Sequence, residues 1–408
     1  MVRIKPFRAV RPPKEHASEV ASRPYDVLNS AEAKAEATER SLLHIIKPEI
    51  DFDPIADEHS QPVYDKAVEN FRRWQSEGWL RQDPEEYYYI YAQTMEGRTQ
   101  YGLAMCCHFE DYLSGAIKKH ELTRPDKEED RMIHVRNQKA NIEPVFFAYP
   151  DDAEIDAIVA DVVKNNAPEY DFTAADGFGH QLWVIRDRKT NDRITEIFAG
   201  IPALYVADGH HRSASNARCA RDLAKENPNH SGDEDYNWFL SVCFPAGQLK
   251  ILPYNRVVKD LAGRTSEEFL AELKKVCEVS KTSEKEPKSP TNVNMYLGGE
   301  WYALAFGSTD GLDAVESLDV SLLQNRVLSP LLGIGDPRTD ERIDFVGGIK
   351  GVKELERLVD SGEFKVAFSM YPTTVEQLMA IADAGQIMPP KSTWFEPKLR
   401  SGLFVHTF

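Results

Sequence analysis

The sequence predicts an α+β fold with a mixed sheet and antiparallel hairpins, organised as two domains in 408 residues. Helical and extended patterns follow one another without a strict βαβ order, which disfavours a purely parallel sheet. Several short β-rich segments are separated by glycine-containing turns, which is typical of hairpins. The length exceeds what one small core requires, so we expect a nucleotide- or phosphate-binding domain at residues 1–256 and a second α/β domain at residues 257–408, ending in a loop that covers the ligand.

The first elements are a helix followed by a hairpin. Apolar residues recur at helical spacing over residues 63–74, before a glycine at position 78. Residues 86–94 are rich in the aromatic side chains that strands favour, and residues 101–109 are apolar. Glu96-Gly97 lies between these two segments and predicts the turn that joins them.

Later segments repeat this mixture. We expect hairpins at residues 239–244 with 249–254 and at residues 293–297 with 301–306, and an exposed charged loop at residues 281–290. Apolar periodicity predicts helices at 155–163, 193–198, 213–225, 318–327, 352–360 and 374–384, and strands at 181–185, 203–207 and 366–370.

The composition restricts the class of partner. A net charge of −17 with a pI near 5.2 repels nucleic acid and anionic lipid, so any phosphate must be held by a local basic pocket. We find neither a signal peptide nor an apolar stretch that could span a membrane, which predicts a cytoplasmic protein. Five cysteines without a CxxC pair indicate reduced thiols. The sequence leaves the oligomeric state open, and a homo-oligomer is possible.

The densest set of reactive groups lies in the run Asp208-Gly209-His210-His211-Arg212-Ser213. An apolar strand stops there and a helix of small residues begins, so free N–H groups and the positive end of a helix dipole converge at the turn. Arg212 adds a forked cation for phosphate, and Asp208 is placed to carry Mg²⁺ or accept a proton. The alternative is an ordinary helix start whose polar side chains are satisfied locally.

A second cluster precedes another predicted helix. Thr123 and Asp126 match a capping box, so the helix should begin near Arg124. His120 and Glu121 stand at a strand end just before it, where either could move a substrate proton. The alternative for the helix itself is a charged surface that faces solvent.

Two weaker signals lie near the ends of the chain. Residues 23–27 form a short charged turn, and residues 388–402 form a loop with cations and aromatic residues that could enclose a flat anionic ligand. Either segment could equally be structural. We expect the substrate-binding residues to be Arg23, Tyr25, Asp26, Arg124, Asp126 and Lys391.

Several common motifs are absent. The chain has no P-loop, dinucleotide-binding glycine motif, GxSxG elbow or HExxH motif. Neighbouring His210 and His211 point in different directions, and no other histidine or cysteine lies at zinc-binding spacing nearby, so the sequence does not predict a zinc site.

The box Gly209-His210-His211-Arg212 resembles the Gly-x-x-Arg box of the ParB and sulfiredoxin-like superfamily. Together with residues 23–27, 120–126 and 389–398, it makes the whole chain similar to the bacterial domain-of-unknown-function family numbered 1015. The superfamily includes free-serine kinases, which are similar at the Asp-Gly-His-His-Arg run. Sulfiredoxin has a cysteine in its box where this chain has His210, so the resemblance does not imply redox chemistry.

This resemblance implies a nucleotide-dependent phosphotransferase that acts on a small hydroxylated metabolite, with free L-serine or O-phosphoserine as the substrate expected by analogy. Its co-substrate would be ATP or ADP with Mg²⁺, and a small molecule and a nucleotide would be its partners. One alternative is a non-catalytic sensor of a nucleotide or phosphorylated metabolite. Another is a ParB-like clamp that hydrolyses CTP.

Overall fold

The computed structural model describes all 408 residues and divides the chain into two compact units. Unit 1 comprises Met1–Leu249 and Pro397–Phe408, and unit 2 comprises Lys250–Glu396. We expected one boundary at residue 256, with the C-terminal segment in the second domain. In the structure, Pro397–Phe408 belongs to unit 1. The backbones of Val405 and Val10 exchange hydrogen bonds of 2.8 and 2.9 Å. A contiguous division of the sequence cannot anticipate such pairing between opposite ends of the chain.

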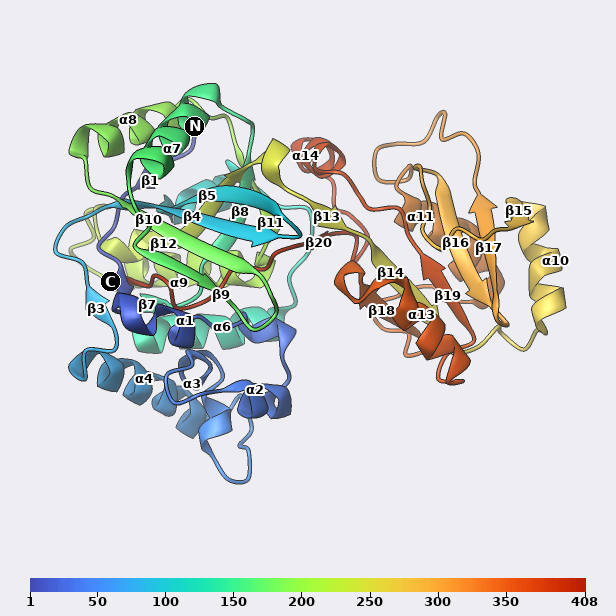
Figure 1. The fold of residues 1–408 in the computed structure, drawn as a ribbon, viewed down its shortest axis with the longest axis horizontal. Helices are drawn as coiled ribbons and strands as arrows, with labels where there is room; N and C mark the ends of the chain where they lie inside the picture. The colour runs from blue at the N-terminus through green and yellow to red at the C-terminus, as the bar shows by residue number, and fades with distance from the viewer. The chain divides into compact units, whose positions relative to one another are not determined.

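Unit 1 is built on a nine-stranded sheet (Figure 1). Along the sheet its strands are β6 (Ile117–Lys118), β11 (Leu204–Asp208), β8 (Val145–Tyr149), β12 (Trp238–Pro245), β5 (Arg98–His108), β4 (Tyr88–Met95), β10 (Gly179–Ile185) and β9 (Tyr170–Thr173), with β1 (Ile4–Lys5) also on β5. Strand β11 is parallel to β6, and β12 is parallel to β8, whereas the other pairs are antiparallel. The predicted α+β class with a mixed sheet is therefore confirmed.

Two groups of helices accompany this sheet, above and below it in the view of Figure 1. Helices α7 (Ala153–Asn165) and α8 (Arg188–Phe198) pack against each other and on β10. In the other group, α6 (Pro125–Gln138) packs between α4 (Gln61–Ser76) and α9 (His210–Glu226). The short elements of unit 1 are β2 (Val10–Arg11), α1 (Ala17–Val20), α2 (Ser30–Glu36), α3 (Leu43–Ile46), β3 (Arg81–Gln82), α5 (Phe109–Ser114), β7 (Ala140–Asn141) and β21 (His406–Thr407).

The core of unit 1 follows from the composition of its central strands. Tyr88, Ile90 and Ala92 of β4 are at most 1% exposed and join one apolar cluster with Phe147 of β8 and Phe239 of β12. Burial of such side chains contributes about 1.5–3 kcal/mol each, so this part of the sheet forms a rigid base for the loops at its edges.

Unit 2 is a second α+β assembly. Its six-stranded sheet has only antiparallel pairs, so the expected α/β arrangement is wrong for this unit. The strands in order are β15 (Glu278–Lys281), β17 (Glu300–Ala305), β16 (Asn292–Leu297), β19 (Val366–Ser369), β14 (Tyr254–Val258) and β18 (Ile343–Gly347). The other elements are β13 (Ile251–Leu252), paired with β20 (Trp394–Phe395), and helices α10 (Ser266–Val276), α11 (Asp319–Leu323), α12 (Ser329–Leu332), α13 (Gly351–Asp360) and α14 (Val375–Asp383).

Most of the predicted local elements are confirmed, with two corrections. The hairpins β4–β5 and β16–β17 form as expected. The hairpin expected at residues 239–254 does not form, because β12 pairs within unit 1 while the chain after Leu249 enters unit 2. The capping box at Thr123 is also absent: the N-cap is Arg124, and the Thr123 hydroxyl donates to Glu128. No helix has the length and apolar character needed to cross a membrane.

Candidate functional site

Two parallel strands bring the two predicted clusters together. Leu204 and Tyr205 of β11 pair with Ile117 and Lys118 of β6. Because parallel strands end at the same edge of a sheet, the residues that follow β6 and β11 lie beside each other. His120 therefore meets His210, although 90 positions separate them in the sequence.

Gly209 forms the turn from β11 into α9. Its φ of +91° lies in the left-handed region, where side chains are strained, and a Cβ there would lie 3.0 Å from Nε of Arg212. Gly209 caps the helix without any side-chain hydrogen bond. Since the first N–H groups of a helix have no partner within it, the turn offers a site for an anion.

Asp208 is held between two cations. Its Oδ1 accepts a 2.6 Å hydrogen bond from Nζ of Lys398, and its Oδ2 accepts one of 2.7 Å from Nη2 of Arg212. Burial alone would raise the pKa of this carboxyl, but the neighbouring charges of Lys398 and Arg212 lower it below its usual range. Asp208 is therefore ionised, and any Mg²⁺ would share its oxygens with these two side chains.

Arg212 points into the protein. It is 5% exposed, and its Nη1 donates to the carbonyl oxygen of Pro144 at 2.7 Å. Burial disfavours the charged guanidinium, but Asp26, Asp208 and Glu143 raise its pKa above the usual value. Its Nε is buried and has no hydrogen-bond partner. Arg212 thus organises the acidic groups around the turn and retains one donor.

The imidazoles of His120 and His210 face each other across the turn. Their Nε2 atoms are 3.4 Å apart, and both side chains are buried. Burial lowers the pKa of His120 to about 4 and lowers the pKa of His210 well below its usual value. Glu121 lies beside them, with one ligand atom from each of the three residues within 4.8 Å of the others. Both imidazoles are therefore neutral near pH 7 and can accept a proton or bind a metal.

A charged layer formed by Tyr25, Asp26, Arg131 and Glu143 adjoins Arg212. The Arg131 guanidinium stacks over the ring of Tyr25, with its Cζ atom 4.1 Å from the ring centre. Glu143 accepts from the backbone N–H of Tyr25 and from the hydroxyl of Ser401, each at 3.1 Å. A cavity of about 30 Å³, room for about one water, is lined in part by Arg131, Glu143 and Arg212.

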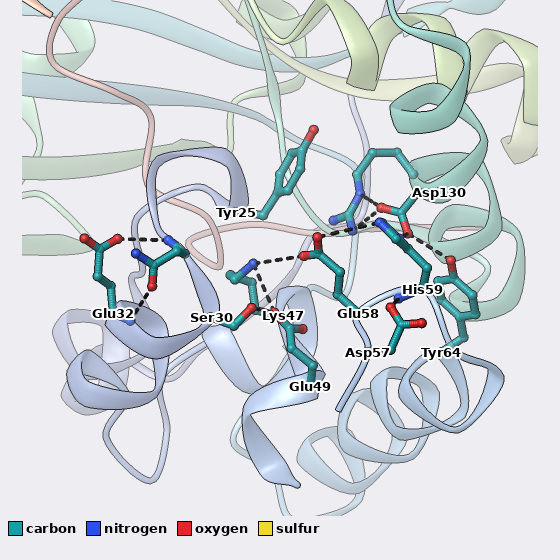
Figure 2. Close-up of polar contacts among 12 residues, drawn as sticks. Tyr25, Ser30, Glu32, Lys47, Glu49, Asp57, Glu58, His59, Tyr64 and Asp130 are labelled. Carbon is teal, nitrogen blue, oxygen red and sulfur yellow. Dashed lines mark hydrogen bonds and ion pairs between the residues drawn. The ribbon is translucent and has the colours of Figure 1, made fainter. Parts of the chain in front are cut away.

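Figure 2 shows the polar contacts around Asp130, next to Tyr25. Asp130 pairs with Arg131 and accepts 2.9 Å hydrogen bonds from His59 and the hydroxyl of Tyr64. Burial would raise the pKa of Asp130, but Arg131 lowers it to about 2. Arg131 is consequently fixed as a cation beneath Tyr25.

The remaining predicted residues lie in different places. Both Ser213 donors are used, since its N–H and its hydroxyl donate to the carbonyl of Gly209. His211 accepts a 3.1 Å hydrogen bond from the backbone N–H of Arg124, whose side chain forms an exposed pair with Asp126. His211 thus connects the two predicted clusters.

Two predicted basic groups have other partners. Arg23 pairs with Glu36 at the surface of unit 1. Lys391 belongs to unit 2, where its Nζ lies 5.6 Å from the ring centre of Tyr254. Their expected contact with a substrate carboxylate stays a prediction.

Sequence reasoning missed the roles of Lys398 and Glu143 and the burial of Arg131. Lys398 was noticed only as one cation of the C-terminal loop, and nothing local distinguishes it from Lys391. Glu143 lies in an apolar stretch, where a single carboxylate before Pro144 could have indicated a buried acid. Arg131 sits on a helix of many charges, so its burial has no local signal.

Comparison with known proteins gives a family and some distant structural similarities. No curated protein matches the chain. Among solved structures, a conserved hypothetical protein from Pyrococcus furiosus is 14% identical, with 74% of this chain and 94% of that chain covered at a TM-score of 0.36. A free serine kinase in complex with AMP is 14% identical, with coverage of 74% and 91% and a TM-score of 0.37. SbnI from Staphylococcus aureus with a C-terminal truncation is 12% identical, with coverage of 74% and 86% and a TM-score of 0.39.

These structural similarities are too distant to indicate an activity. The match to a sequence family is more extensive. The family described as Protein of unknown function (DUF1015) matches residues 4–321, which is more than half of the chain. The chain therefore belongs to the DUF1015 family.

Proposed function

We propose that the protein is a nucleotide-dependent phosphotransferase whose second substrate is a small hydroxylated metabolite, free L-serine or O-phosphoserine. The observation that carries the proposal is the start of α9 at Gly209, where no side chain caps the helix. The cations Lys398 and Arg212 lie at this turn. The proton acceptors His120 and Glu121 lie beside it. Phosphoryl transfer depends mainly on positioning and charge neutralisation, which such a group supplies.

The nucleotide phosphates are assigned to the N–H groups at the start of α9. A helix N terminus presents N–H donors and a partial positive charge, and both favour phosphate. Gly209 supports this role because its left-handed backbone allows the sharp turn from β11 into α9 and its missing side chain leaves room for the Arg212 guanidinium. Unit 1 is accordingly proposed to be a ParB/sulfiredoxin-like nucleotide-binding fold.

Proton transfer is assigned to Glu121 or His120. A general base must carry a free lone pair at working pH, and burial keeps His120 neutral by lowering its pKa to about 4. Asp208 is assigned to Mg²⁺, with Lys398 and Arg212 as the neighbours that keep it ionised. Asp208 would hold the ion at the end of β11, and the ion would neutralise charge on the phosphate.

The acceptor is assigned to the charged layer that adjoins Arg212. An amino acid carries both an ammonium and a carboxylate, and this layer contains Asp26 and Glu143 together with Arg131. Serine is chosen because the Asp-Gly-His-His-Arg run resembles that of free-serine kinases. Arg23, Tyr25, Arg124, Asp126 and Lys391 remain proposed contributors to substrate binding.

Phosphorus NMR on the purified full-length protein tests the proposal. With Mg²⁺ and L-serine, one of ATP, ADP, CTP or AMP should give a new O-phosphoserine resonance that is absent without serine. Asp208→Asn should abolish this resonance, whereas Asp222→Asn, a change on α9 away from the turn, should not. If a nucleotide binds tightly but no serine-dependent resonance appears, a non-catalytic sensor replaces the kinase.

A further inference from the structure

The geometry points to a binding site for a divalent first-row transition metal of the Zn²⁺ type, formed by His120, Glu121 and His210. The three residues come from the ends of two parallel strands that are far apart in the sequence. The test of this inference is binding of the metal alone and does not require phosphotransfer, although a metal here would occupy the side chains proposed as the general base.

The spacing of the two imidazoles fits a shared metal. Zinc binds histidine nitrogen at about 2.0–2.1 Å, so two nitrogens in a tetrahedral shell lie about 3.3–3.4 Å apart. The two Nε2 atoms of His120 and His210 are 3.4 Å apart. The two rings are nearly perpendicular, with centres 4.5 Å apart, so a small rotation of the side chains would direct both nitrogens at one ion.

A direct hydrogen bond explains this contact less well. The usual N–H···O distance is about 2.7–3.2 Å, so the 3.4 Å contact between these two nitrogens is a long hydrogen bond. His210 is 7% exposed, and its Nδ1 is buried without a hydrogen-bond partner. Buried polar groups are rarely left so poorly satisfied. An ion at Nε2 would give the ring a strong interaction in place of this long contact, and Nδ1 would keep its proton.

Glu121 completes a set of three ligands. One ligand atom of Glu121 and of each histidine lie within 4.8 Å of one another. Glu121 is only partly buried, so a small rotation of its side chain can bring its carboxylate to the distance that a common ion requires. Two histidines and one carboxylate are a typical set for a catalytic zinc ion, which keeps a further position for water or substrate.

The ligand types also indicate which metal binds. Imidazole suits zinc and other first-row transition ions, whereas Mg²⁺ and Ca²⁺ prefer oxygen ligands. The site is therefore distinct from the Mg²⁺ proposed at Asp208. Because His210 is the first residue of α9, the metal would lie at the same helix start as the anion site, where its open position could take a phosphate oxygen.

The sequence did not predict a zinc site because only histidines and cysteines close together in the chain were compared. His210 and His211 do diverge, as adjacent residues should, and His211 bonds to Arg124 instead. The second histidine comes from the end of β6, and only the pairing of β6 with β11 brings it close.

Metal binding to the untagged full-length protein tests this site. After treatment with a chelator and dialysis, the protein should bind one Zn²⁺ per chain in competition with a chromophoric indicator. Co²⁺ in its place should give the strong visible absorption of a tetrahedral ion. Glu121→Gln should weaken Zn²⁺ binding by at least about tenfold and His120→Gln by about 100-fold or more, since even second-shell changes cost about 10–100-fold.

His211→Gln is the matched control, because it changes a histidine of the same turn that lies outside the cluster. It should leave Zn²⁺ affinity unchanged. Circular dichroism confirms that each variant is folded, and the partly buried Glu121 provides a test that does not depend on a core substitution. The site is refuted if folded wild-type protein binds no Zn²⁺, or if Glu121→Gln and His120→Gln both retain wild-type affinity and stoichiometry.

Discussion

The Nζ of Lys398 lies 2.6 Å from Oδ1 of Asp208, so the last residues of unit 1 are tied to the end of β11. The two side chains are 18% and 21% exposed, and this partial burial reduces solvent screening of the pair. The C-terminal segment therefore contributes a charge to the same turn that holds Gly209 and Arg212.

Replacing Lys398 by Met should destabilise the protein by about 2 kcal/mol, because Asp208 loses a charge-assisted hydrogen bond in a partly buried place. Urea unfolding at pH 7 measures this change. Lys66→Met is the control, since Lys66 pairs with Glu69 on the exposed side of α4 and should change stability by less than about 0.5 kcal/mol. Equal effects at the two positions would contradict the role given to Lys398.

Replacing Gly209 by Ala should cost roughly 2 kcal/mol and weaken any ligand at the start of α9. The residue would have to keep a φ of +91° and place its Cβ 3.0 Å from Nε of Arg212. Gly97→Ala separates these two causes, since Gly97 has a φ of +77° but no atom near the added Cβ. Thermal unfolding should show a larger loss at position 209, and a smaller loss there than at position 97 would rule out the steric contribution.

His180 should make stability depend on pH. Its Nε2 accepts from Arg400 at 3.2 Å and its Nδ1 contacts the Tyr91 hydroxyl at 2.8 Å. Burial, and then the Arg400 charge, lower its pKa from 6.5 to about 3. The unfolded chain therefore binds the proton first as pH falls, so stability is complete above pH 6.5 and is lost between pH 6.5 and 3, by about 1.4 kcal/mol per pH unit.

Urea unfolding at pH 7 and pH 5 tests this prediction. The wild-type protein should lose roughly 2 kcal/mol more than His180→Gln over this interval, because Gln keeps an acceptor for Arg400 but does not titrate. His16→Gln, at a partly exposed position, should behave like the wild type. Equal pH dependence of the unfolding free energy in wild type and His180→Gln would show that folding does not lower the pKa of His180.

The sequence was sufficient for the turn itself. The apolar run into Asp208 and the small residues after Gly209 specify a strand and a helix locally, and β11 and α9 form there. It was also sufficient for the hairpin β4–β5, because two β-rich segments flank a short glycine turn. In both cases the determining residues are neighbours in the chain.

Features that depend on pairing between distant segments could not be predicted in this way. Lys398 reaches Asp208 only because the C-terminal segment returns to unit 1. The burial of Arg212 was also not evident: a forked cation at a helix start was expected to face a ligand, yet two of its nitrogens bond to Asp208 and Pro144. Its side chain is fixed by buried acids that lie elsewhere in the sequence.

The last prediction concerns Glu121 and combines the two proposals about the site. If Glu121 takes the proton from the substrate hydroxyl, Glu121→Gln should lower kcat by about 10²–10⁴-fold while KM for serine stays close to its wild-type value, since the amide keeps the shape but cannot accept the proton. Glu154→Gln is the matched control, because Glu154 forms an exposed pair with Arg193 outside the proposed site and should change kcat little. Steady-state kinetics should be accompanied by a measurement of bound Zn²⁺.

Recovery of kcat when Zn²⁺ is added would assign Glu121 to the metal, whereas a loss that zinc does not repair would assign it to proton transfer. An unchanged kcat would leave His120 as the base.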